Sequence, residues 1–155
     1  MTDPRELRID RVIDAPVDIV WRAWTEHGAE WFCPQPWRAE IVEQDLRPGG
    51  RSAMVMHGPA GERNAIEGVI LNAVPGRLIV STDAFTHGWH PAGPFMVRID
   101  RFDPDPNDPA KTRYSAIARH WTAEAAEKHK AMGFESGWSA ATDQLEAVAK
   151  RLAAG

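Results

Sequence analysis

The C-terminal part of the chain, residues 123–152, has the pattern of one long amphipathic helix. Apolar side chains recur there at steps of three and four, which places them on a single stripe, while the opposite face is charged. A helix with such a narrow apolar seam is stable only when it packs on another part of the protein. The rest of the chain must therefore supply a surface for this stripe, which consists of Ala131, Phe134, Trp138, Ala141, Leu145, Val148 and Leu152.

Most of the chain before this helix has the pattern of β-strands separated by short turns. A strand is expected at residues 7–13, after which Ala15-Pro16 introduces an amphipathic helix beginning at Val17. A further short helical turn is expected at residues 28–32, before prolines break the chain. Runs of apolar and alternating residues predict the other strands, at residues 39–44, 52–57, 64–74, 78–85, 95–102 and 112–121.

The connections between these strands set the fold class. Strands joined by short turns pair antiparallel, because a parallel crossover needs a dozen or more residues. We therefore predict an α+β fold forming a single domain over residues 1–155. In this fold a curved antiparallel sheet of six to seven strands wraps around the long C-terminal helix, and two short helices follow the first strand. Segments 86–94 and 103–109 are expected to be loops, and the prolines of 103–109 to interrupt strand pairing.

Composition and charge restrict the partners that the chain is expected to have. The net charge of −4 argues against nucleic acid or an anionic membrane as a partner, since both select basic patches. The sequence has neither an apolar run long enough to span a bilayer nor the features of a signal peptide. Its single cysteine, Cys33, fits a reducing compartment. A cytoplasmic protein is therefore expected.

Several short motifs give the chain a family resemblance. The most specific combination is Asp-Leu-Arg-Pro-Gly-Gly at residues 45–50 with the late Gly137-Trp138. From Leu7 to Leu152 the sequence resembles the bacterial proteins similar to the C-terminal domain of the activator of the heat-shock protein 90 ATPase, in the START/Bet v 1-like helix-grip superfamily (SRPBCC). The resemblance implies a cavity between the sheet and the long helix. It also implies binding of a hydrophobic small molecule, and it supplies no fixed catalytic residues.

Aromatic and methionine side chains are the candidates for lining such a cavity. Seven tryptophans against one tyrosine indicate large apolar surfaces, and methionine suits a surface that adapts to varied ligands. Periodicity alone favours a solid core built from the same side chains, whereas the resemblance favours a cavity. Trp31 and Trp89 are expected towards its mouth, and His87 or His120 is expected to orient a polar group. The expected ligand-binding residues are Trp31, Met54, Met56, Phe85, His87, Trp89, His120, Phe134 and Trp138.

No metal site or cofactor site is predicted. His87 and His90 are three residues apart, but a metal would need further ligands that only His57 or His120 could bring through the fold. The glycines at 49–50 lie between strands rather than before a helix, which indicates a hairpin turn and not a phosphate-binding loop.

No catalytic residue is predicted either. Cys33 has no evident partner that would stabilise a thiolate. The acidic residues on the strands are interpreted as a solvated outer face, although an acid or histidine pointing into the cavity would be a functional candidate. These acidic residues are Glu43, Glu67, Asp83 and Asp100.

Gly133 and Gly137 lie inside the predicted long helix. Each costs about 0.5–1 kcal/mol relative to alanine at a helix interior. A close approach of a strand, or space for a ligand over Phe134 and Trp138, would compensate for this cost. A kink in the helix is the alternative.

These features favour a binding protein without catalytic activity, whose ligand is a small hydrophobic or amphipathic molecule. The alternative function is that of a protein-interaction module acting on a chaperone or stress partner, which predicts an exposed patch and little cavity. A cyclase or hydrolase of the same superfamily is a third reading, and it requires an inward-facing acid or base. The sequence leaves open whether the protein is a monomer or a homodimer.

Overall fold

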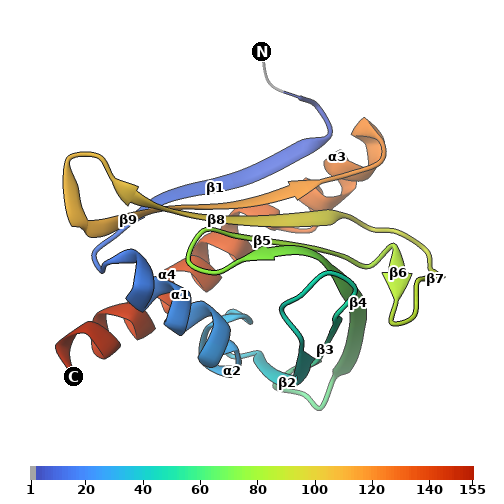
Figure 1. Ribbon diagram of the computed structural model, residues 1–155. Coiled ribbons are helices and arrows are strands. Elements are labelled where there is room, and N and C mark those ends of the chain that lie inside the picture. Colours follow the sequence, from blue (N-terminus) through green and yellow to red (C-terminus); the bar gives the residue numbers. More distant parts are fainter. Residues whose placement is uncertain (1–2) are drawn as a thin grey trace.

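The dominant feature of the computed structural model, which describes residues 3–155, is one large antiparallel sheet with helices on one face (Figure 1). The order of the elements in the chain follows the predicted order. It is β1 (Glu6–Ile13), α1 (Val17–Glu26), α2 (Gly28–Trp31), β2 (Arg38–Gln44), β3 (Arg51–His57), β4 (Arg63–Val74), β5 (Leu78–Thr82), β6 (Phe85–Thr86), β7 (His90–Pro91), β8 (Val97–Asp105), β9 (Asp108–Arg119), α3 (Ala123–Ala131) and α4 (Phe134–Ala154).

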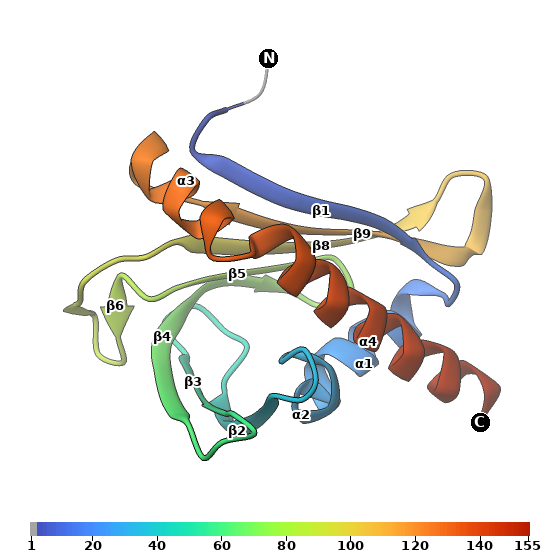
Figure 2. The ribbon, with the colours of Figure 1, turned by 180° about the vertical axis from the view of Figure 1, so that it is seen from behind.

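The sheet has seven strands in the order β1-β9-β8-β5-β4-β3-β2, and every neighbouring pair is antiparallel. The first and last strands of the chain, β1 and β9, therefore lie side by side. Seen from behind, α3 and α4 run across the concave face, and β2 to β4 curl away from the other strands (Figure 2). The predicted α+β helix-grip fold is confirmed.

Helix α1 covers one end of the concave face. It begins directly after Pro16, a residue suited to the start of a helix, and Asp18 places a negative charge in its first turn. Val20, Ala23 and Trp24 form its buried face, which packs towards α4, β8 and β9. The predicted second short helix is α2, whose Trp31 is buried.

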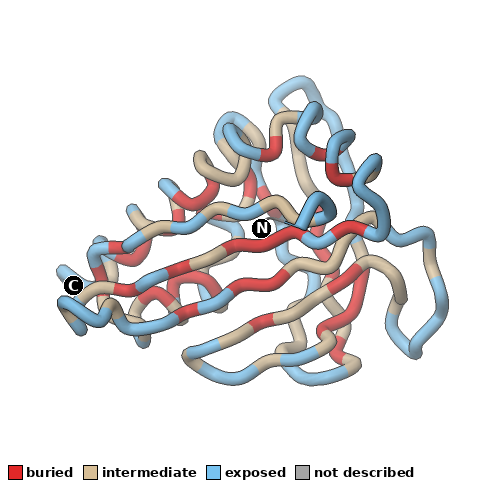
Figure 3. Tube along the Cα trace, turned by 90° about the horizontal axis from the view of Figure 1, so that it is seen from above, coloured by how far each residue is buried: buried red, intermediate tan, exposed pale blue. Residues whose placement is uncertain are grey.

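The hydrophobic core lies between the concave face of the sheet and the helices, as the buried stretches in Figure 3 show. Burial of large apolar side chains is the main stabilising term at this interface. The core includes Ile13, Val20, Trp24, Trp31, Ile70, Ile79, Phe102, Tyr114, Leu145 and Ala149.

The predicted single helix over residues 123–152 is wrong in one respect, because it is two helices. Gly133 has a φ of +97°, in the left-handed region that glycine tolerates without a steric penalty. Helix α3 therefore ends before it and α4 begins after it at Phe134. The structure therefore shows the kink that was the alternative for Gly133, and not a continuous helix. No helix within residues 3–155 is long and apolar enough to cross a membrane.

Two predicted loops also contain strand pairing. In segment 103–109, β8 continues to Asp105 and β9 begins at Asp108, with the irregularity confined to Pro104 and Asp105. The Asp105 carboxylate closes this turn by accepting a hydrogen bond from the Asn107 N–H at 3.1 Å. In segment 86–94, a two-stranded hairpin, β6–β7, turns at Gly88 and Trp89, both with positive φ. Phe85 belongs to this hairpin instead of β5.

Candidate functional site

A cavity of about 460 Å³ lies between the curled part of the sheet and the helices. Strands β2, β3, β4, β5 and β8 contribute to one side, and α1, α2, α4 and the segment after α2 contribute to the other. Its lining is mostly apolar. The lining residues are Trp24, Trp31, Phe32, Cys33, Pro34, Gln44, Ser52, Met54, Met56, Ile66, Glu67, Gly68, Ser81, Thr82, Asp83, Phe95, Met96, Arg98, Gly137, Trp138, Ala141 and Thr142.

The structure brings four of the nine predicted ligand-binding residues together in this lining: Trp31, Met54, Met56 and Trp138. Strand alternation puts the two methionines on one face of β3, and the structure turns that face inward. Trp31 was expected near the mouth, but it is only 1% exposed and forms part of the interior wall.

His120 and Phe134 lie behind the cavity wall. Phe134 packs on Trp138 at a centroid distance of 4.5 Å and on His129 at 5.2 Å. The His120 Nδ1 lies 2.9 Å from the Arg5 carbonyl oxygen, and its Nε2 lies 2.9 Å from His129 Nδ1. Because a carbonyl only accepts, His120 donates from Nδ1 and accepts at Nε2 from His129. His120, directly after β9, therefore joins Arg5 to α3 and does not line the cavity.

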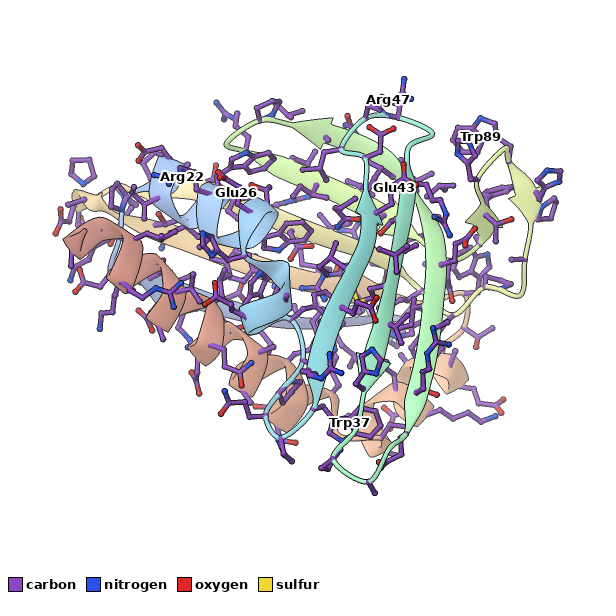
Figure 4. All side chains as sticks on the ribbon, turned by 90° about the horizontal axis from the view of Figure 1, so that it is seen from below. Arg22, Glu26, Trp37, Glu43, Arg47 and Trp89 are labelled. Carbon is purple, nitrogen blue, oxygen red and sulfur yellow. The ribbon has the colours of Figure 1, made fainter. Side chains whose placement is uncertain are left out.

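The other three predicted residues, Phe85, His87 and Trp89, belong to the β6–β7 hairpin and its turn. Trp89 is 52% exposed, and its ring packs on that of Phe85 at a centroid distance of 5.7 Å. Figure 4 shows Trp89 beside the small hairpin at the edge of the molecule. His87 is exposed. The hairpin turns these side chains away from the lining, which sequence periodicity does not reveal.

Histidines and acids show no metal-binding arrangement in residues 3–155, where no group of three or more His, Cys, Asp or Glu side chains converges. His87 and His90 are exposed, and the His57 Nε2 instead lies 2.8 Å from a Glu40 carboxylate oxygen. Cys33 lines the cavity, where burial raises the pKa of its thiol. The thiol is therefore protonated at neutral pH, which suits packing better than nucleophilic attack.

Arg98, on β8, is the main polar feature of the site that the sequence analysis missed. Its guanidinium carbon lies 4.3 Å from the ring centroid of Trp138, 4.9 Å from that of Phe32 and 5.9 Å from that of Trp31. Such contacts place a cation against the negative faces of aromatic rings. The cavity thus has a charged group set within an aromatic wall.

Asp100 is the partner of this arginine. The Arg98 Nε donates to one carboxylate oxygen at 2.9 Å and Nη2 to the other at 3.1 Å. Tyr114 donates its hydroxyl at 2.6 Å and Trp24 its indole N–H at 3.3 Å to the same carboxylate. The prediction that Asp100 lies on a solvated outer face is wrong, since it is 0% exposed. Four donors compensate its buried charge.

The same network sets the protonation of its members. Burial lowers the pKa of Arg98, but the neighbouring Asp100 and Tyr114 outweigh this effect and the pKa is raised overall. Burial and the Asp100 charge raise the pKa of Tyr114 well above its ordinary value. Arg98 is therefore charged and Tyr114 is a neutral donor at physiological pH.

The two other acids that line the cavity already have partners. The Asp83 carboxylate accepts hydrogen bonds from the Phe95 N–H at 2.8 Å and the Met96 N–H at 3.2 Å. Glu67, whose side chain is 38% exposed, accepts from Arg51 Nη2 at 2.9 Å. Gln44 differs, because its Oε1 is buried and no group within residues 3–155 donates to it.

The glycine at the start of α4 keeps the cavity open. A Cβ added at Gly137 would meet no atom within 4 Å, and Gly137 is part of the lining. Space for a ligand, one of the three interpretations of this glycine, therefore matches its position. Gly68 has a different role, since a Cβ there would lie 2.2 Å from the Thr82 carbonyl oxygen. Its small size permits the close approach of β4 and β5.

This geometry defines the class of protein: an α+β helix-grip fold with an internal, largely apolar cavity. A family model described as "Activator of Hsp90 ATPase homolog 1-like protein" matches residues 14–150, and the chain belongs to this family. None of the curated proteins matches it.

Solved bacterial structures share the fold. Protein NE0264 from Nitrosomonas europaea is 32% identical, with a TM-score of 0.91 and full coverage of both chains. Protein Ms6760 from Mycobacterium smegmatis is 26% identical, with a TM-score of 0.76 over 94% of this chain and 91% of its own. The AHSA1 protein SPO3351 from Silicibacter pomeroyi is 17% identical and shares the fold at a TM-score of 0.66, over 92% of this chain and 95% of its own.

Proposed function

We propose that the protein binds a small, mostly apolar molecule in the cavity between the sheet and α4. The observation that carries this proposal is the cavity itself, whose volume of about 460 Å³ falls within the range of small-molecule sites. Tryptophan and methionine side chains from β3, α2 and α4 supply its apolar wall. These side chains offer a large, adaptable contact area.

Two details support a binding space over a solid core. The position of Gly137 leaves room that a larger side chain would fill, and the buried Gln44 Oε1 has no donor among the described residues. Native cores rarely leave such a group unsatisfied. Binding without catalysis fits the lining, because its carboxylates are held by hydrogen bonds and its thiol is protonated.

Native mass spectrometry of the freshly purified protein tests the proposal, with the same sample measured again after denaturation and solvent extraction. We expect a small molecule bound at a one-to-one ratio that is lost on denaturation, or a thermal shift with members of a panel of lipids and aromatic compounds. Gly137→Leu should abolish either signal by filling the cavity. Ser136→Leu, exposed on the same helix, is the matched control and should keep it. A protein that stays unliganded and shows no shift with any compound would refute the proposal.

The family description favours one alternative, a protein-interaction module that modulates an ATPase of the heat-shock protein 90 type. An ATPase assay with the purified chaperone tests it. Stimulation that persists in Gly137→Leu would support this alternative, since it would not depend on the cavity.

A further inference from the structure

Only some of the N–H groups of the Arg98 guanidinium donate hydrogen bonds to other groups of the protein. An arginine has five N–H donors in a planar fork. Its Nε and one N–H of Nη2 bind Asp100. The structure shows no hydrogen bond from either N–H of Nη1, or from the outer N–H of Nη2, to an acceptor within residues 3–155. Three strong donors are therefore unused.

Two of these donors, one on Nη1 and the outer one on Nη2, lie along the Nη1–Nη2 edge of the guanidinium, next to the edge that binds Asp100. Because Asp100 takes the Nε side, the Nη1–Nη2 side is the edge left for the cavity that Arg98 lines. Trp31, Phe32 and Trp138 surround the group with rings that cannot accept a conventional hydrogen bond. A ligand oxygen is the natural partner for this edge.

The other charged groups in the lining do not compete for the same role. Asp83 and Glu67 are acceptors that already receive hydrogen bonds. The charge of Asp100 is shared among Arg98, Tyr114 and Trp24, so it does not fully offset the field at the far edge of the guanidinium. The polar group beside the aromatic rings that still has unused hydrogen-bonding capacity is thus the Arg98 guanidinium, which is a cation and can only donate.

We propose that the ligand of this cavity carries a carboxylate, which binds the free Nη1–Nη2 edge of Arg98, and an apolar body that lies along Trp138 and Met54. The inference rests on the proposed function. Two parallel N–H donors match the two oxygens of a carboxylate, which makes arginine the usual partner for that group.

Titration with three compounds that share one alkyl chain tests the inference: decanoate, decanamide and decanol. Binding is followed at neutral pH by tryptophan fluorescence and by calorimetry. We expect decanoate to bind about 10- to 100-fold more tightly than decanol, the effect of a charge-assisted hydrogen-bonded pair. Decanamide, which is neutral, should lie near decanol.

Arg98→Lys is the informative variant, because it keeps a cation beside Asp100 but loses the second edge. It should bind decanoate no more tightly than decanol, so the readout is the ratio of the two affinities. The double variant Arg98→Leu with Asp100→Asn removes both charges together and tests the same point if the lysine variant fails to fold. Arg101→Lys, an exposed residue on the same strand, is the control and should keep the preference.

The outcomes separate the inference from the function on which it rests. Binding of decanol as tight as that of decanoate would overturn the carboxylate and leave the proposed function standing. A preference for decanoate that survives in both Arg98 variants would also overturn it. Failure of all three compounds to bind would count against both.

Discussion

The two ends of α4 lie in contrasting surroundings. Near the C-terminus, Leu145 and Ala149 are completely buried where the helix packs on α1 and β1. Near its start, Gly137 and Trp138 border a cavity instead. The comparison shows that the cavity exists because Gly137 has no side chain and because β2 to β4 curl away from the other strands. All helices and strands of the fold are present at this end. The C-terminal half of α4 thus packs in the core, and its first turns border the cavity.

The largest expected effect is on the free energy of unfolding, and it tests whether the two ends of α4 are packed differently. Leu145→Ala should lower the free energy of unfolding by about 3–5 kcal/mol, because it opens a hole in a filled core. Met54→Ala should cost about 2 kcal/mol, the low end of the range for a buried methionine, since that side chain already borders the cavity. Urea denaturation measures both. Equal losses would show that the two ends are packed alike.

Acid should weaken the open end through His129. Burial, and secondarily the neighbouring His120, lower the pKa of His129 to about 4, from an ordinary value of 6.5. As the pH falls below 6.5, the histidine becomes protonated in the unfolded chain while it stays neutral in the folded protein. The free energy of unfolding therefore decreases as the pH falls from 6.5 towards 4. The loss is at most about 3 kcal/mol.

The measurement is the free energy of unfolding against pH for the wild type and for His129→Gln. The variant should lack this part of the acid dependence, while the part due to carboxylates remains. Parallel curves for the two proteins would contradict the assignment to His129.

The smallest expected effect is at Gly137. Gly137→Ala should raise the free energy of unfolding by about 0.5–1 kcal/mol, because alanine favours the helix and its Cβ would meet nothing. The matched change Gly133→Ala should instead destabilise, since alanine is strained at a φ of +97°. Thermal unfolding of the two variants separates these effects. A lower melting temperature for Gly137→Ala would mean that the space is not open.

Hydrophobic periodicity predicted most of the fold. The alternation in the strands and the apolar stripe of the C-terminal segment gave the elements and their order, and the short turns gave antiparallel pairing. The break at Gly133 is predicted only as the kink alternative, because a glycine inside a periodic stretch fits either a continuous helix or a left-handed interruption. The strand pairing in segment 103–109 is not predicted because its prolines indicate a loop, although Asp105 supplies the turn.

The cavity lining was harder to predict than the fold. Met54 and Met56 share a strand face in the sequence, but only the three-dimensional sheet shows that this face is the inner one. The burial of Asp100 was predictable from the sequence. Asp100 and the apolar Phe102 are two residues apart on one strand, so they lie on the same face, and Phe102 is buried. Phe85, His87 and Trp89 are wrongly predicted to line the cavity because the β6–β7 hairpin reorients their side chains. The residue types alone do not indicate in which direction this hairpin turns them.

The pairing of β1 with β9 also governs the order in which the chain folds. Glu6 and Arg119, which face each other across these strands, are 113 residues apart. During synthesis β1 must wait until residues 108–119 have emerged, so this half-buried strand remains without its partner for most of translation. Because contacts this distant in sequence slow folding, the β8–β9 hairpin is expected to form first and β1 to join last. Substitutions that weaken the β8–β9 turn should therefore slow folding more than they speed unfolding.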